Sequence, residues 1–93
     1  MKTVVFGLCE GRHEIPISDY IFSGVVDPTD VDGLFEIANS AIPEDVTNVI
    51  IYVTGLTVAF GAVVAVCAKR GIALEARHFN RDTNEYYAQT ILN

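Results

Sequence analysis

The tetrapeptide Thr54-Gly55-Leu56-Thr57 has the composition of an anion-binding turn. It follows the apolar run Val49–Val53 and precedes a long apolar segment, so we expect it to join a strand to a helix. A helix N-terminus presents unpaired N–H groups and partial positive charge, which suit a phosphate or carboxylate. Gly55 would let a ligand approach the backbone, and both threonines offer hydroxyls. The motif lacks the glycines and lysine of Walker and dinucleotide loops, and a tight turn that binds nothing is the alternative.

A second polar cluster reads Arg77-His78-Phe79-Asn80-Arg81-Asp82. It falls at the end of the next expected strand, which meets the same sheet edge as the tetrapeptide if the two strands are parallel. His78 is a candidate catalytic acid or base, while Asn80 and Arg81 are candidate ligand-binding residues, with Arg81 as a phosphate clamp. Arg77 and His78 should point to opposite faces, so at most one serves the site. A polar turn with a solvated arginine is the alternative.

A third cluster, Glu10-Gly11-Arg12-His13, follows the first expected strand and should open at the same edge. All four residues are candidate ligand-binding residues lining one pocket, and a surface loop is the alternative. Glu10, His13 and Asp82 do not have the spacing of a metal site. We therefore assign no metal ligand and no certain cofactor, and a divalent metal is left open.

The elements that must position these clusters follow from hydrophobic patterning and from turn residues. Strands are expected at Thr3–Leu8, Val46–Val53, Ile72–Phe79 and Glu85–Leu92, with a hairpin turn at Arg81–Asn84. One helix should begin after Asp27–Asp30 and stop at Pro43, and another should run from Val58 to Arg70 and end at Gly71. Residues 9–26 are expected to form a long loop or irregular edge, with short extended pieces at Ile15–Ile17 and Tyr20–Phe22 as the alternative. The pattern predicts an α/β fold with a small Rossmann-like βαβ core, a mostly parallel sheet and a C-terminal β-hairpin.

The helical segments carry different apolar patterns. The first places Val31, Leu34, Phe35 and Ala38 on one stripe, which should face the core. The second is apolar nearly all round, so we expect it to be covered on more than one side, by the sheet and by a partner subunit.

Composition narrows the class of protein. The chain has 93 residues, which predicts one domain over residues 1–93. Hydrophobic residues make up 51% of it, which is more than so small a core needs, so a homodimer or another closed homo-oligomer is expected. The net charge of −6 argues against bulk nucleic-acid binding, because phosphate contacts need a basic surface. A small anionic ligand held by one or two arginines is still compatible.

The cysteines and the apolar runs indicate the cellular compartment of the protein. Cys9 and Cys67 form no CxxC motif, so a reduced, buried pair is expected. The start of the chain lacks the pattern of a secretory leader, and the longest apolar run, Val58–Ala68, is too short to span a bilayer. We expect a cytoplasmic protein of a bacterial or phage-infected cell, with no membrane partner.

The C-terminal half, Val49–Gln89, resembles the Csx-three family of small CRISPR accessory proteins, which is distantly akin to the CRISPR-associated Rossmann-like sensor domains. That family carries a central strand, Ser/Thr-Gly-Arg-x-Pro, a helix, a strand, Asp-Pro-Arg and a final strand. The matching runs here are Val53-Thr54-Gly55, the helix from Val58, His78-Phe79-Asn80-Arg81 and Tyr86-Tyr87-Ala88-Gln89. Two positions depart from the pattern: Leu56 stands at the family's arginine and Asn80 at its aspartate.

The resemblance implies binding of a cyclic tetra-adenylate messenger, which the family cleaves in a metal-assisted way, with Thr54, Gly55 and Arg81 carried over. The expected function is a cyclic-oligonucleotide binding protein in antiviral defence, acting either as a ring nuclease or as a viral sponge. The two departures favour capture over cleavage, and whether the protein is an enzyme is left open. The alternative is a ligand-free, homo-oligomeric interaction protein that docks through its apolar helix.

Overall fold

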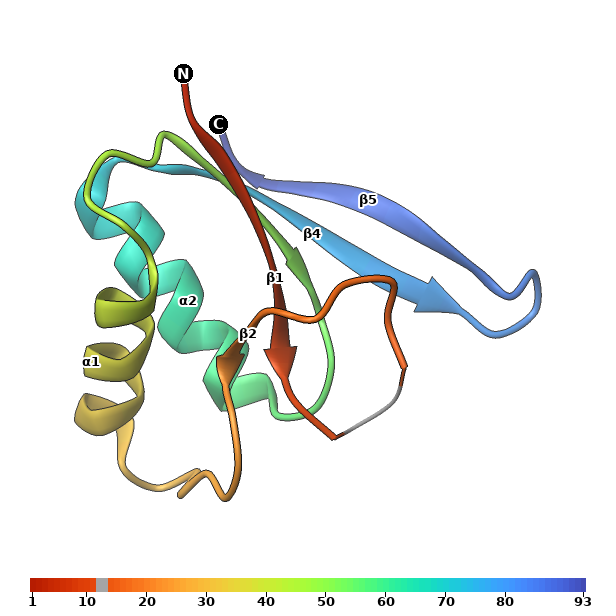
Figure 1. Ribbon diagram of the computed structural model, residues 1–93, viewed down its shortest axis with the longest axis horizontal. Coiled ribbons are helices and arrows are strands. Elements are labelled where there is room, and N and C mark those ends of the chain that lie inside the picture. The colour runs from red at the N-terminus through yellow and green to blue at the C-terminus, as the bar shows by residue number, and fades with distance from the viewer. Residues whose placement is uncertain (12–13) are drawn as a thin grey trace.

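The computed structural model describes residues 1–11 and 14–93 (Figure 1). In chain order the elements are β1 (Thr3–Cys9), β2 (Tyr20–Phe22), α1 (Val31–Ala41), β3 (Asn48–Tyr52), α2 (Thr57–Arg70), β4 (Ala73–Asn80) and β5 (Glu85–Leu92). The predicted α/β class is confirmed. A five-stranded, mostly parallel sheet, two helices and an antiparallel C-terminal hairpin form a small Rossmann-like core.

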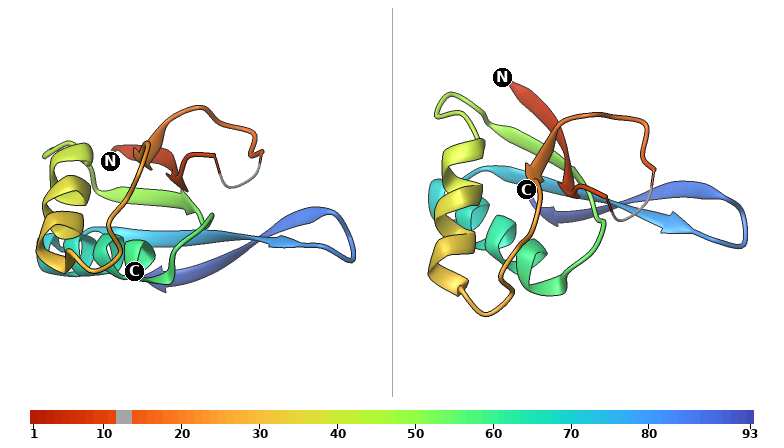
Figure 2. Two further views of the ribbon diagram at one scale, coloured as in Figure 1. Left: turned by 90° about the horizontal axis from the view of Figure 1, so that it is seen from below. Right: turned by 60° about the horizontal axis from the view of Figure 1, so that its bottom comes forward.

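The strand order β2-β1-β3-β4-β5 decides where the helices lie. The first four strands pair in parallel, and β5 pairs antiparallel with β4. The connections through α1 and through α2 both move across the sheet in the same direction, from β2 to β3 and from β3 to β4. Right-handed crossovers of this kind place both helices on one face, as the views in Figure 2 show. In the described part of the chain, the other face carries no helix.

The core lies between the helices and one face of the sheet. Val49 and Ile51 of β3 are buried, while the alternate residues Ile50 and Tyr52 face the side without helices and are half-buried. From α1, the buried residues Leu34 and Ala38 complete the packing as expected. Val31 does not: its side chain is 61% exposed. Val31 is the first residue of α1, one turn before the first buried position, so the prediction for it was wrong.

The region 9–26, expected as a loop or irregular edge, contains a short strand. Tyr20 and Phe22 of β2 pair in parallel with Gly7 and Cys9 of β1. Three residues are too few for a periodic signal, and only tertiary pairing with β1 defines them as a strand. Helix α2 begins at Thr57, one residue earlier than expected, and β3 is shorter at both ends than the apolar run that predicted it.

Helix α2 is covered on two sides by its own chain. It buries Ala59, Ala62, Val63, Val66 and Cys67 against the sheet and α1. The positions it exposes include Gly61, Ala65 and Ala68, which are small. Among the described residues, no helix combines the length and apolar character needed to cross a membrane.

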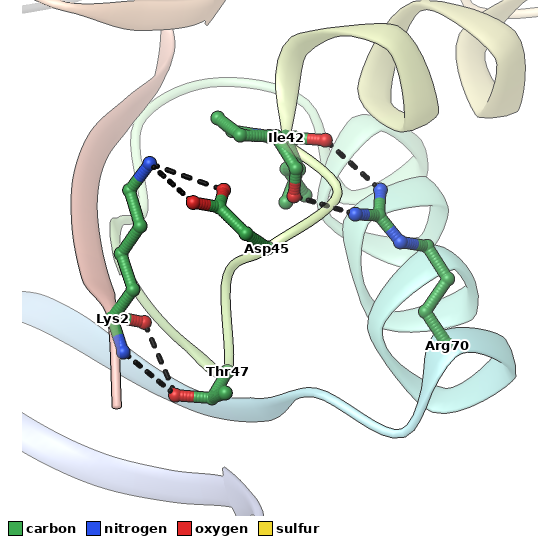
Figure 3. Close-up of polar contacts among 6 residues, drawn as sticks. Lys2, Ile42, Asp45, Thr47 and Arg70 are labelled. Carbon is green, nitrogen blue, oxygen red and sulfur yellow. Dashed lines mark hydrogen bonds and ion pairs between the residues drawn. The ribbon is translucent and has the colours of Figure 1, made fainter.

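Polar contacts fasten the amino edge of the sheet (Figure 3). The Lys2 ammonium lies 3.1 Å from Asp45, and the Lys2 N–H donates to the Thr47 hydroxyl at 3.1 Å. The hydrogen bond from Lys2 lowers the pKa of Asp45. At the C-terminal end of α2, Arg70 donates to the carbonyls of Ile42 at 3.0 Å and of Pro43 at 2.6 Å, which follow α1. The starts of β1 and β3 are thus joined at the edge opposite the predicted site.

Candidate ligand-binding site

Thr54 locks the carboxyl ends of β1 and β3 together. Its side chain is 1% exposed, and its hydroxyl oxygen accepts from the Cys9 N–H at 3.0 Å. The same hydroxyl donates to the Cys9 carbonyl at 2.8 Å. Buried backbone groups at the end of a ladder need partners, and Thr54 supplies both to Cys9. Its hydroxyl therefore positions the strands of the site and is already occupied within the chain.

The turn after Thr54 delivers the start of α2 to the carboxyl edge. Gly55 has φ +85°, a left-handed conformation that glycine adopts without a Cβ clash. Leu56 is the N-cap in extended geometry and makes no side-chain capping bond. The first bond inside α2 runs from the Phe60 N–H to the Leu56 carbonyl at 3.2 Å. The N–H groups from Thr57 onward in the first turn have no intrahelical partner, so they are available to an anion.

The chain leaves β1 and β3 toward opposite faces of the sheet. After β3 it enters α2 on the helical face. After β1 it passes over the other face, where a Cβ placed on Gly7 would lie 2.5 Å from the Ile15 side chain and 2.6 Å from the Tyr20 ring. Open α/β sheets bind ligands in the crevice where the strand order reverses in this way, here between β1 and β3.

Part of the third cluster lies at this switch point. Glu10 and Gly11 are exposed directly after β1, and the Glu10 N–H donates to the Phe22 carbonyl of β2 at 2.9 Å. Since Cys9 is bonded to Thr54, these two residues lie beside the turn at Gly55. Arg12 and His13, also predicted to bind ligand, lie outside the described residues.

The second cluster extends beyond the edge. Strand β4 runs parallel to β3 as expected, and their last pair is Tyr52 with Arg77. Arg81 lies four residues farther along, which is roughly 13 Å of extended strand. The hairpin β4–β5 projects away from the start of α2 (Figure 1). Asn80 accepts from the Asp82 N–H at 2.9 Å and so stabilises the turn, while Arg81 is exposed in it.

His78 belongs to the hairpin. Its Nε2 lies 2.8 Å from the Gln89 side-chain oxygen, and its ring centroid lies 5.4 Å from that of Tyr87. One ring nitrogen of His78 is therefore engaged by Gln89 within the hairpin.

Arg77 lies on the opposite face of β4 from His78, as alternation predicts. Its guanidinium donates to Glu75 and lies 5.9 Å from the Tyr52 ring centroid. The hydrogen bond to Glu75 raises the pKa of Arg77. Arg77 is therefore part of the helix-free face and is already paired with a carboxylate.

An aromatic cluster on the helix-free face was not predicted. The rings of Tyr52 and Tyr86 lie 4.9 Å apart and those of Phe79 and Tyr86 5.2 Å apart. The Tyr86 hydroxyl donates to the Glu14 carbonyl at 3.2 Å, so the chain after β1 reaches across to this cluster. Burial, with smaller effects of Tyr52 and Tyr20, raises the pKa of Tyr86. The alternation of side chains along each strand indicates which face each of these rings occupies. The alternation shows that the rings meet only when the register between the three strands is known.

The cysteines and acidic residues suggest no further chemistry. Cys9 and Cys67 are free and buried, as expected, and burial raises the pKa of Cys67 to about 11. Within residues 1–11 and 14–93, no group of three or more His, Cys, Asp or Glu side chains is arranged to hold a metal ion.

Comparisons with protein-family models, curated proteins and solved structures found no match.

Proposed function

We propose that this chain binds a cyclic oligonucleotide messenger at the switch point between β1 and β3. The observation that carries the proposal is the divergence of the chain after these two strands, beside a helix α2 whose N-terminus has no side-chain cap. The N–H groups that follow Gly55 would receive a phosphate. Glu10 and Gly11 would form the opposite wall, with Arg12 and His13 following them in the chain.

The distribution of cations supports a local anion site within an acidic protein. Four of the six Lys and Arg residues make contacts within the described chain: Lys2 with Asp45, Lys69 with the Phe35 ring, Arg70 with carbonyls after α1, and Arg77 with Glu75. Of the remaining two, Arg81 is exposed in the hairpin turn, and Arg12 lies outside the described residues. Phosphate binding at the start of α2 would thus depend mainly on backbone N–H groups. Arg81, roughly 13 Å of strand beyond the edge, would hold another phosphate of a ligand large enough to reach the hairpin.

The aromatic cluster favours a nucleotide over a simple anion. Tyr52 is the last residue of β3, two positions before Thr54, and Arg77 lies over its ring. Tyrosine and phenylalanine rings beside an arginine are surfaces on which nucleobases stack, with about 1–3 kcal/mol per base. A ligand with several bases and phosphates could contact both this cluster and the start of α2.

We favour capture over cleavage. Leu56 and Asn80 replace the arginine and aspartate of the Csx-three pattern, which residues 49–89 resemble. The candidate base His78 is bonded to Gln89 within the hairpin. In this proposal the protein is a sponge in the cytoplasm of a bacterial or phage-infected cell, where it would lower the concentration of a defence messenger.

The alternative is an interaction protein that docks through α2. Val63 and Val66 are buried inside the chain, and the exposed apolar positions Gly61, Ala65 and Ala68 are small. The larger side chains Val58, Phe60 and Val64 are half-buried against the core. Since no fully exposed position of α2 carries a large apolar side chain, we rank the alternative second.

A thermal-shift screen against cyclic di-, tri- and tetranucleotides tests the proposal. Ligand at about 100 times its Kd should stabilise the fold by roughly 2.7 kcal/mol. A linear tetranucleotide is the matched control, since it carries the same bases and phosphates without the ring. No response to any cyclic ligand at millimolar concentration would favour the interaction protein.

A second experiment separates capture from cleavage. Stoichiometric protein is incubated with the ligand that scored, then denatured and chromatographed. Intact ligand is the expected result. Linear products would make the protein a ring nuclease, and His78→Ala should then slow turnover by about 10²–10⁴-fold with little change in affinity.

A further inference from the structure

Strand β5 is a long, open edge of the sheet (Figure 1). Its eight residues include one charged side chain, Glu85, and neither lysine nor proline. Soluble proteins usually block such edges with charge, proline or short strands, because unpaired backbone groups accept another strand. The opposite edge, β2, has only three residues. The sheet is therefore protected at one edge and open at the other.

The helical side of β5 carries both a protruding ring and a hollow. Tyr87 is 54% exposed and lies opposite His78, on the same side of the hairpin as the buried Ala76. Farther along the strand, a hollow of about 350 Å³ opens between the end of α2 and the end of β5. It is lined by Cys67, Ala68, Gly71, Ile72, Ile91, Leu92 and Asn93. A protrusion and a hollow on one strand make a self-complementary surface, as a two-fold interface requires.

We propose that β5 pairs antiparallel with β5 of a second copy of this chain, so that Tyr87 of each copy packs against the hollow of the other. A two-fold axis requires that residues opposite each other lie on the same face, and registers centred on Ala88 or on Gln89 satisfy this requirement. The register centred on Ala88 places Tyr87 of the second copy diagonal to Ile91. The register centred on Gln89 places it directly opposite Ile91. Glu85 then lies opposite Ile91 or Asn93, so the two Glu85 carboxylates do not meet.

The length of β5 limits the strength of this dimer. Eight residues span roughly 26 Å, and a sheet is about 10 Å thick, which gives about 260 Å² of projected contact per copy. A standard interface buries about 800 Å² per partner. The dimer should therefore form reversibly with concentration. This inference is independent of the proposed ligand, and its test uses no nucleotide.

Sedimentation equilibrium from about 1 µM to about 1 mM tests the proposal. Wild-type mass should rise from 10.1 kDa towards twice that value. Tyr87→Ala removes the ring, and Ala88→Lys brings two cations together at the centre, so both should stay monomeric. Ser40→Lys on α1 makes the same charge change away from β5 and should behave as wild type.

Mixing provides the specific confirmation. Equal amounts of Ala88→Lys and Ala88→Glu chains should recover the dimer, because opposite charges then meet across the axis. Circular dichroism establishes that each variant is folded, and if Ala88→Lys is not, Tyr87→Ala decides the question. A wild type that stays at 10.1 kDa throughout, or a Tyr87→Ala variant that dimerises as wild type does, would overturn the proposal.

Discussion

One threonine hydroxyl, that of Thr54, accepts from the Cys9 N–H at 3.0 Å and donates to the Cys9 carbonyl at 2.8 Å. The two residues are separated by 45 positions in the chain and sit at the ends of neighbouring strands. This pair of bonds sets where the chain leaves β1 relative to the turn that starts α2. The candidate site is therefore held by a side chain that a ligand need not touch.

Thr54→Val should destabilise the fold. Valine keeps the shape but leaves the buried Cys9 N–H and carbonyl without their partner, which costs about 1–3 kcal/mol. Urea unfolding followed by circular dichroism measures the loss. Thr57→Val, an exposed change three residues away, should stay within about 0.5 kcal/mol of wild type. Equal effects of the two substitutions would contradict the structural role assigned to Thr54.

Gly55→Asn should separate folding from ligand binding. Asparagine tolerates the left-handed conformation at φ +85°, so the variant should keep its fold. The added side chain should obstruct the approach of the messenger to the backbone and weaken binding about tenfold or more, or about 1.4 kcal/mol. Titration calorimetry with the cyclic ligand measures the change. Wild-type affinity in the folded variant would remove the turn from the site.

Arg81→Ala should weaken binding without unfolding the chain, because Arg81 is exposed in the hairpin turn. A lost charge-assisted hydrogen bond costs roughly 1.5–3 kcal/mol, or about 10–150-fold in Kd. Lys69→Ala is the matched control, since it removes one exposed cation at the far end of α2. If both variants lose affinity equally, the effect is one of overall charge and Arg81 is no clamp.

The fold should lose stability in alkali through Cys67. Burial raises the pKa of its thiol from 9.0 to about 11. Below pH 9 the thiol is protonated in both states. As the pH rises from 9 through 11, the Cys67 thiol ionises in the unfolded chain before it ionises in the folded one, so unfolding is favoured. The urea midpoint should fall across this window, and Cys67→Ala should flatten the fall. An identical pH profile for the two proteins would show that this thiol has no part in it.

The sequence predicted the fold better than the site because apolar patterning reports burial directly. Val49–Val53 and the segment that became α2 carried strong periodic or continuous apolar signals, and the structure forms the expected elements there. Strand β2 had no such signal, since Tyr20–Phe22 is defined by its pairing with β1. Apolar patterning also predicted that the turn at Gly55 and the chain after β1 lie at the same edge of the sheet, because both follow expected parallel strands.

Apolar patterning could not predict the bond from Thr54 to Cys9 or the aromatic cluster. The bond spans 45 positions, and Tyr52 meets Tyr86 only because β4 separates β3 from β5 at a fixed register. How far Arg81 lies beyond the edge depends on how long β4 continues after its last pair with β3. Long-range contacts of this kind leave no periodic trace in a single sequence.

Amide chemical shifts during titration with cyclic tetra-adenylate test the central claim most directly. The proposal predicts saturable shifts at the amides of Gly55, Leu56 and Thr57, at the start of α2, and at Glu10 and Gly11, after β1. The amides at the starts of β1 and β3, at the opposite edge of the sheet, and those at the C-terminal end of α2 should change little and serve as the internal reference. No shifts at millimolar ligand, or shifts confined to residues away from the β1–β3 switch point, would contradict the account.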